Sequence, residues 1–162
     1  MIEKFFLKKT GLYLLIVGIL LLHQGCATRM LQVTPDVRNK FLNGQIVLDC
    51  QLSCHYSLSS SLPQLAKLYS EGKWQQLADE VIRIGYINDL TYFYLGRAAE
   101  GLGQYKAALR YYQNSANTYE KGANRAIFRC KSSIRNECNG IDFPQEQITH
   151  QMNVQKRMKK TV

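Results

Sequence analysis

The sequence predicts an all-α domain, built as a short solenoid of about two helical hairpins with flanking helices and stapled by disulfides. Two observations predict this fold. First, apolar and small residues recur at helical spacing over 89–103 and again over 104–119, a pattern typical of amphipathic helices. Second, glycine, an aromatic two places later and an apolar residue five places later occur at 72–77 and again at 103–108. A motif repeated at an offset of 31 residues is typical of stacked hairpins.

Residues 1–25 have the composition of an export signal. Lys4, Lys8 and Lys9 form a basic start, and 11–22 is a run of twelve residues without a charge. That run fits the core of a signal peptide and is shorter than the roughly 20 residues that cross a bilayer as a helix. The sequence therefore predicts that the domain lies outside the cytoplasm.

The predicted signal ends at Gly25-Cys26, and a small residue followed by cysteine directly after a signal core resembles the lipobox of bacterial lipoproteins. The resemblance implies that cleavage occurs before Cys26 and that its thiol carries palmitate or another acyl chain. His23 and Gln24 depart from the usual Leu and small residue, so an ordinary cleaved signal and an uncleaved anchor are the alternatives. Ala27 implies, by resemblance to Gram-negative lipoproteins, an outer-membrane protein facing the periplasm, with secretion or inner-membrane anchoring as alternatives.

The segment after the signal, 26–45, has no sustained periodicity and contains Pro35, Asn43 and Gly44. Residues of this kind between periodic segments are typical of loops. We therefore expect a tether that holds the domain off the membrane, with the helical domain itself over 46–143.

Four further cysteines flank the repeats, with Cys50 and Cys54 before them and Cys130 and Cys138 after them. An even number in an exported chain predicts two disulfides. We expect bridges between the two pairs, which close loops of roughly 80 residues and stabilise by about 4 kcal/mol; two local bridges are the alternative. The seven residues inside the second pair disfavour a zinc site, and the absence of Cys-x-x-Cys disfavours thiol-redox chemistry.

The best-defined repeat, 89–122, resembles the tetratricopeptide-repeat (TPR) family. The residues that fall on the spacing of that motif are Tyr92, Leu95, Gly96, Gly103, Tyr105, Ala108 and Tyr112. The closing proline is absent, and the match over 58–88 is weaker and about three residues short of the usual 34. The resemblance implies stacked hairpins with a concave groove, lined by the first helix of each repeat, that binds a peptide.

Local signals define the ends of the second hairpin. Asp89 or Asn88 is suited to cap its first helix, and Gly103 to end it in a left-handed conformation. Gly96 and Ala108 are small where two antiparallel helices need close approach.

The C-terminal part, 121–160, is expected to hold a third hairpin. Its first helix is predicted at 124–133, and its second at 145–160 after the helix-starting Pro144. Residues 144–162 are thus predicted as a C-terminal helix with a basic tail.

The expected peptide groove takes its residues from the faces opposite the packing stripes. On the second repeat these are Phe93, Arg97 and Glu100, and on the first repeat Tyr69 and Ala66. An aromatic beside an arginine suits a peptide that carries an acidic group. The alternative is that Phe93 packs on the neighbouring hairpin and Arg97 is a solvated helix residue.

Catalytic chemistry is not indicated, because His55 and His150 stand in no recognisable catalytic or metal-binding spacing and no phosphate loop is present. We expect a non-enzymatic protein without catalytic residues, metal or cofactor. The predicted role is a scaffold or assembly adaptor for a protein or peptide partner of the cell envelope. Nucleic acid is not an expected partner, and the oligomeric state stays open.

The charge distribution supplies an alternative function. Of the net charge of +9, residues 26–103 contribute zero, whereas 104–162 carry eleven basic and four acidic side chains. Such a region attracts polyanions. The alternative is therefore a basic membrane-surface or polyanion-binding accessory protein. Its candidate residues are Arg125, Arg129, Lys131, Arg135, Lys156, Arg157, Lys159 and Lys160.

Overall fold

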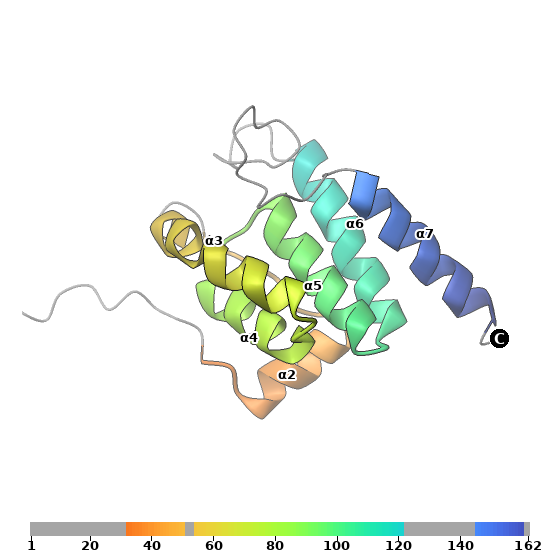
Figure 1. Cartoon of the computed structure of the whole chain (residues 1–162), viewed down its shortest axis with the longest axis horizontal. Helices are drawn as coiled ribbons and strands as arrows, with labels where there is room; N and C mark the ends of the chain where they lie inside the picture. Colours follow the sequence, from red (N-terminus) through yellow and green to blue (C-terminus); the bar gives the residue numbers. More distant parts are fainter. Residues whose placement is uncertain (1–31, 51–53, 122–144, 161–162) are drawn as a thin grey trace, which may run out of the picture.

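A computed structural model describes residues 32–50, 54–121 and 145–160. Within these ranges the chain is all-helical, as the sequence predicts, with six helices and no β-strand (Figure 1). None of these helices is both long and apolar enough to cross a bilayer. The helices are α2 (Pro35–Leu42), α3 (His55–Ser70), α4 (Trp74–Ile84), α5 (Asp89–Gly101), α6 (Tyr105–Lys121) and α7 (Gln145–Lys160).

Helix α5 is the central element of the core. It packs against α4, α6 and α7, and Figure 1 shows it between α4 and α6. Its buried apolar side chains are Leu90, Tyr92, Phe93, Tyr94, Leu95, Ala98 and Ala99. Full burial of a leucine or phenylalanine side chain stabilises by about 1.5–3 kcal/mol. Because these residues point in every direction around the helix, α5 has almost no face left for solvent.

The start of α5 is fixed by a reciprocal capping box. The side chain of Asn88 accepts from the backbone N–H of Thr91 at 2.7 Å, and the Thr91 hydroxyl accepts from the N–H of Asn88 at 3.2 Å. Each bond satisfies a donor that the first helical turn would otherwise leave unpaired. Of the two predicted caps, Asn88 is the one that the structure uses.

The turns α3–α4 and α5–α6 repeat the same hydrogen bonds at an offset of 31 residues. The N–H of Lys73 donates to Leu68 O at 2.9 Å, and that of Gln104 to Ala99 O at 2.8 Å. The glycines that precede them, Gly72 and Gly103, have φ of 65° and 74°. Glycine adopts this left-handed conformation without steric cost. The predicted stop at Gly103 is confirmed.

The N-terminal segment corrects the predicted tether. Residues 35–42 form α2, and its Phe41 is fully buried and stacks on Tyr111 at 5.8 Å between ring centroids. The Tyr111 hydroxyl donates to Phe41 O at 3.0 Å and accepts from Ile46 N at 3.3 Å. An Arg38–Asp79 ion pair at 2.8 Å ties α2 to α4. Because these contacts are tertiary, most of the expected tether belongs to the folded domain.

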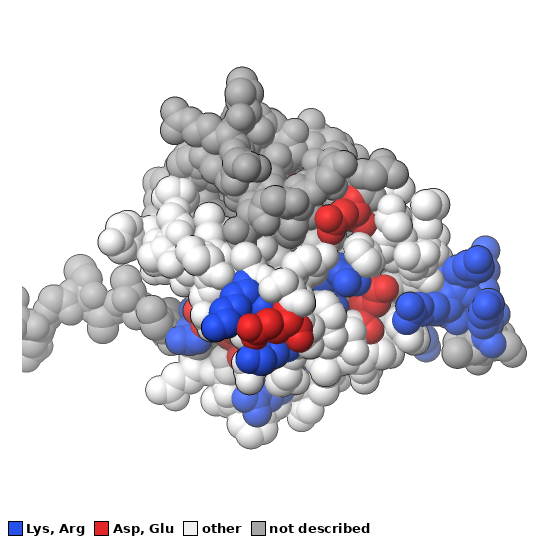
Figure 2. Space-filling model, viewed as in Figure 1, with Lys and Arg blue, Asp and Glu red and all other residues white. Residues whose placement is uncertain are grey.

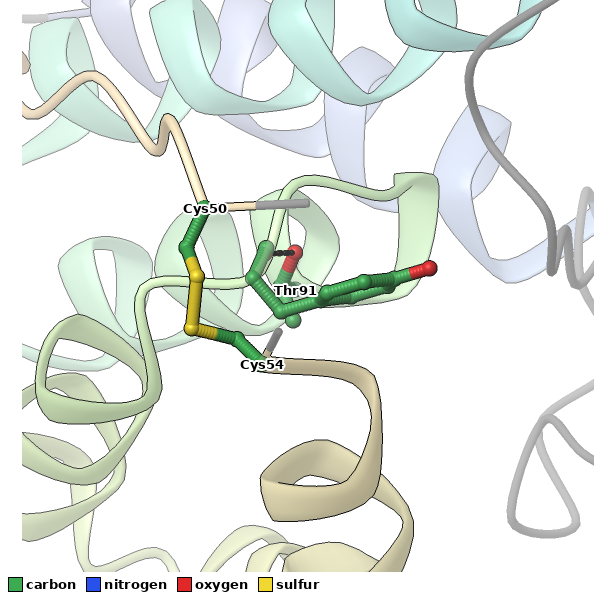
Figure 3. The surroundings of a disulfide bond; sticks show 4 residues. Cys50, Cys54 and Thr91 are labelled. Atoms are coloured by element: carbon green, nitrogen blue, oxygen red, sulfur yellow. Dashed lines mark hydrogen bonds between the residues drawn. A yellow bond between two sulfur atoms is a disulfide. The ribbon is translucent and has the colours of Figure 1, made fainter. Parts of the chain in front are cut away.

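The disulfide pattern also differs from the favoured expectation. Cys50 bonds to Cys54, with 5.9 Å between their Cα atoms, so the bridges predicted between the two cysteine pairs are wrong (Figure 3). The backbone of Cys50 pairs with the segment before α5, accepting from Ile87 N at 2.9 Å. Cys54 directly precedes α3, so the disulfide joins the start of that helix to the segment that pairs with the chain before α5. Cys130 and Cys138 lie outside the described residues.

Candidate functional site

The clearest polar site of the described chain is the surface on which α7 rests, and we call it the α7 platform. It is formed by side chains of α3, α5 and α6 that contact residues of α7 through hydrogen bonds or ring contacts. These side chains are Tyr69, Phe93, Arg97, Glu100, Tyr105 and Tyr112.

Glu100 is the centre of the α7 platform. Its side chain is 7% exposed, and its Oε2 accepts from Arg97 Nη1 at 2.7 Å and from the Tyr112 hydroxyl at 2.8 Å. Nδ1 of His150, from α7, lies 3.1 Å from the same oxygen. A buried carboxylate of this kind is stable only when it is paired and hydrogen-bonded.

These partners keep Glu100 ionised. Burial of the carboxylate raises the pKa of Glu100, but its hydrogen bonds with His150 and Tyr112 and the charge of Arg97 outweigh burial and lower the pKa from 4.5 to about 2. Burial and the nearby Glu100 charge raise the pKa of Tyr112, so its hydroxyl stays a donor. The result is a fixed negative charge beneath α7.

Arg97 supplies the matching positive charge. Its guanidinium lies 5.5 Å from the ring centroid of Tyr69 and 5.3 Å from that of Trp74, which are cation–π distances. Nη1 of Arg97 is also 2.8 Å from Nδ1 of His150. The tautomer of His150 therefore decides whether that nitrogen pairs with Arg97 or with Glu100. Nε of Arg97 is buried with no partner among the described residues.

Helix α7 is held on the platform mainly by polar side chains. Gln147 is buried and donates from Nε2 to the backbone O of Tyr112 at 2.9 Å. Glu146 accepts from the Tyr69 hydroxyl at 3.1 Å. Val154 is the fully buried apolar residue on this side of α7, and Met158 is partly buried. The helix is thus recognised by specific hydrogen bonds more than by apolar area.

Four of the five predicted groove residues, all except Ala66, belong to the α7 platform, but they do not line an open groove. Phe93 is fully buried, and the Arg97 and Glu100 side chains are only 15% and 7% exposed. Tyr69 and Ala66 are half-buried on α3. The prediction is corrected because α7 covers the face of α5 that was expected to be free. Of the alternative, the packing of Phe93 matches its burial, whereas the solvated Arg97 it also expected is wrong, because that side chain is only 15% exposed.

The α7 side of the site was missed in the sequence. From the sequence, His150 has no predicted role, and Arg157 is assigned only to the alternative polyanion-binding function. A signal was present, because His150, Val154 and Met158 recur every four residues. That spacing places three side chains on one face of a helix.

Other candidate chemistry is limited. Among the residues that the structure describes, no group of three His, Cys, Asp or Glu is arranged to hold a metal ion. A hollow of about 470 Å³ lies beside 103–107, and one of about 330 Å³ beside Tyr56. No predicted site residue lines either hollow. The α7 platform is therefore the candidate functional site.

Comparison of this chain with protein-family models, with curated proteins and with solved structures gives no match.

Proposed function

We propose that this chain is a non-catalytic lipoprotein of the cell envelope whose TPR-like helical domain is a scaffold or assembly adaptor for protein partners. The signal-like residues 1–25 and the following Cys26 support anchoring by a lipid, and Ala27 supports a place at the outer membrane, facing the periplasm. The two helical hairpins, whose turns share hydrogen bonds at an offset of 31 residues, support the TPR-like interpretation.

One observation carries the proposed role: a polar helix sits on the α7 platform through side-chain hydrogen bonds. Platform residues contact four polar residues of α7, which are Glu146, Gln147, His150 and Arg157. A surface that binds one helix in this way offers the same donors and acceptors to another. We infer that a partner binds as a helix in exchange with α7, because a surface occupied by its own segment binds a second ligand only by shifting that equilibrium.

The test is site-specific photocrosslinking in intact envelopes. A photoreactive phenylalanine analogue replaces Tyr105, whose hydroxyl accepts from Arg157 Nη1 of α7 at 3.2 Å. The expected result is two products, a link within the chain to α7 and a link to one envelope protein. Excess synthetic peptide 145–160 is expected to reduce the second link. The matched control carries the analogue at Tyr56, which is 82% exposed on α3.

Two results would contradict the exchange. One is that position 105 links only to α7 at every level of expression. The other is that positions 105 and 56 capture the same proteins and the peptide does not compete. Either result would remove the platform as the partner site.

A further inference from the structure

The outward face of α7 carries exposed apolar side chains beside lysines. Ile148 and Met152 are 49% and 57% exposed, one helical turn apart. Lys159 continues the same stripe, and Lys156 lies next to it, because a residue advances by 100° around an α-helix. The opposite side of α7, with Gln147 and Val154, is buried against the platform.

The C-terminal end of α7 concentrates positive charge. Its last five residues include Lys156, Arg157, Lys159 and Lys160, and Figure 2 shows these side chains gathered at the end of the helix. Within the described ranges, no carboxylate forms an ion pair with any of the three lysines. The helix dipole favours basic residues at a helix C-terminus. The dipole does not explain why the apolar side chains of Ile148 and Met152 are exposed on the same helix.

The contacts with the platform hold this face in a fixed orientation. Arg157 donates to the Tyr105 hydroxyl at 3.2 Å, and its guanidinium lies 5.6 Å from the centre of that ring. Two turns earlier, His150 packs against Phe93 at 6.2 Å between ring centroids. While α7 rests on the platform, these contacts at His150 and Arg157 turn the outward stripe away from the core.

We propose that the outward face of α7 docks on an anionic phospholipid surface. Lys156, Lys159 and Lys160 face the head groups, and Ile148 and Met152 enter the interface. Charge complementarity and the exposed apolar pair on the same side of one helix fit a flat lipid surface, because a helix lying in the interface uses basic and apolar side chains together. The proposal rests on the proposed membrane anchor for the nearness of that surface.

The experiment uses the full chain reconstituted in two kinds of vesicle, phosphatidylcholine alone and phosphatidylcholine with phosphatidylglycerol. Lysine acetylation rates are read by mass spectrometry. A basic residue near an anionic surface gains about fivefold in occupancy, so acetylation of Lys156, Lys159 and Lys160 is expected to be about fivefold slower in the anionic vesicles. Salt is expected to abolish the difference. Lys67, exposed on α3, is the internal control and is expected to react equally in both.

A second readout follows the apolar pair. Oxidation of Met152 by peroxide is expected to slow on the anionic vesicles. A triple variant, Lys156→Gln/Lys159→Gln/Lys160→Gln, is expected to lose this protection. A variant of equal charge change, Lys40→Gln/Lys67→Gln/Lys106→Gln, is expected to keep it. Circular dichroism checks that both variants fold.

Equal acetylation in the two vesicle types would overturn the inference, and so would equal protection at Lys67. Protection by soluble polyglutamate but not by anionic vesicles would overturn it in favour of an acidic protein. Vesicle flotation reports the N-terminal anchor separately. A chain that fails to float with neutral vesicles counts against the proposed anchor, while its footprint on anionic vesicles still decides the docking.

Discussion

Gly96 of α5 lies directly against the ring of Tyr112 of α6. A Cβ atom at position 96 would lie 2.5 Å from the ring of Tyr112, well inside van der Waals contact. The ring is fully buried, and its hydroxyl is held by Glu100 at 2.8 Å. The expected close packing at Gly96 is confirmed, and the side chain it makes room for is Tyr112.

Replacing Gly96 by alanine is expected to lower the free energy of unfolding by about 1–3 kcal/mol, the usual cost of an extra methyl in a packed core. Urea unfolding measures it. The matched control is Gly103→Ala, where a Cβ meets nothing within 4 Å but φ is 74°, so the expected loss is about 1 kcal/mol. A Gly96→Ala variant as stable as the wild type would contradict the prediction and show that the helices move apart to accommodate the methyl.

The Glu100 carboxylate predicts an acid-labile component of stability. Its pKa is lowered from 4.5 to about 2 in the folded protein, so its contribution is present above about pH 4.5 and is lost as the pH falls toward 2. The maximum loss is about 3 kcal/mol. Urea unfolding at a series of acidic pH values is expected to show this loss in the wild type, and a smaller loss in Glu100→Gln.

The control for this pH series is Glu71→Gln. A hydrogen bond with Lys73, at 2.8 Å, lowers the pKa of Glu71. Because the pair lies on the surface and is screened by solvent, the variant is expected to keep nearly the acid profile of the wild type. Identical profiles for the wild type and Glu100→Gln would contradict an ionised, stabilising carboxylate beneath α7.

The Cys50–Cys54 bridge predicts a modest effect of reductant. It closes a loop of only five residues, which corresponds to about 2 kcal/mol by chain entropy, about half of what a long-range bridge would give. The Tm is expected to fall on reduction. A Cys50→Ser/Cys54→Ser variant is expected to show the lower Tm without reductant. If the Tm of this variant falls much further when reductant is added, a second disulfide is the main stabilising one.

Lipidation of Cys26 is tested by metabolic labelling with a clickable fatty acid. The wild type is expected to be labelled and to sediment with membranes. Cys26→Ser is expected to lose the label, because the thiol is the acyl acceptor in the proposed lipoprotein. Labelling that persists in the variant would show that another residue is modified, and an unlabelled wild type would exclude the lipid anchor.

Much of the helical framework could be predicted from local sequence. The helix at 145–160, the cap at Asn88 and the stop at Gly103 all depend on neighbouring residues, and the structure has each of them. The same local logic applied to α2 as well, since Thr34-Pro35 is a typical helix start. The prediction of a tether is wrong there because it rests on the lack of apolar periodicity and not on this capping signal.

The candidate site could be predicted only in part, because it depends on contacts between distant segments. Arg97 and His150 are 53 positions apart, and Tyr69 and Glu146 are 77 apart. No local pattern states that α7 covers α5, or that Cys50 pairs with Cys54 and not with a cysteine beyond the repeats. These pairings are set by tertiary packing, which local secondary-structure propensity predicts only weakly.

The N-cap of α2, Thr34, lies close in sequence to the proposed anchor, which limits how far the domain can move from it. Its hydroxyl caps α2 by accepting from Val37 N at 3.4 Å, and eight peptide links separate it from Cys26. Even fully extended, they span about 28 Å, roughly the diameter of a small domain. With a lipid on Cys26, as proposed, the domain would stay close to the membrane that holds the lipid. It would meet only partners at the same membrane face, and a partner anchored elsewhere in the envelope would itself have to reach across to it.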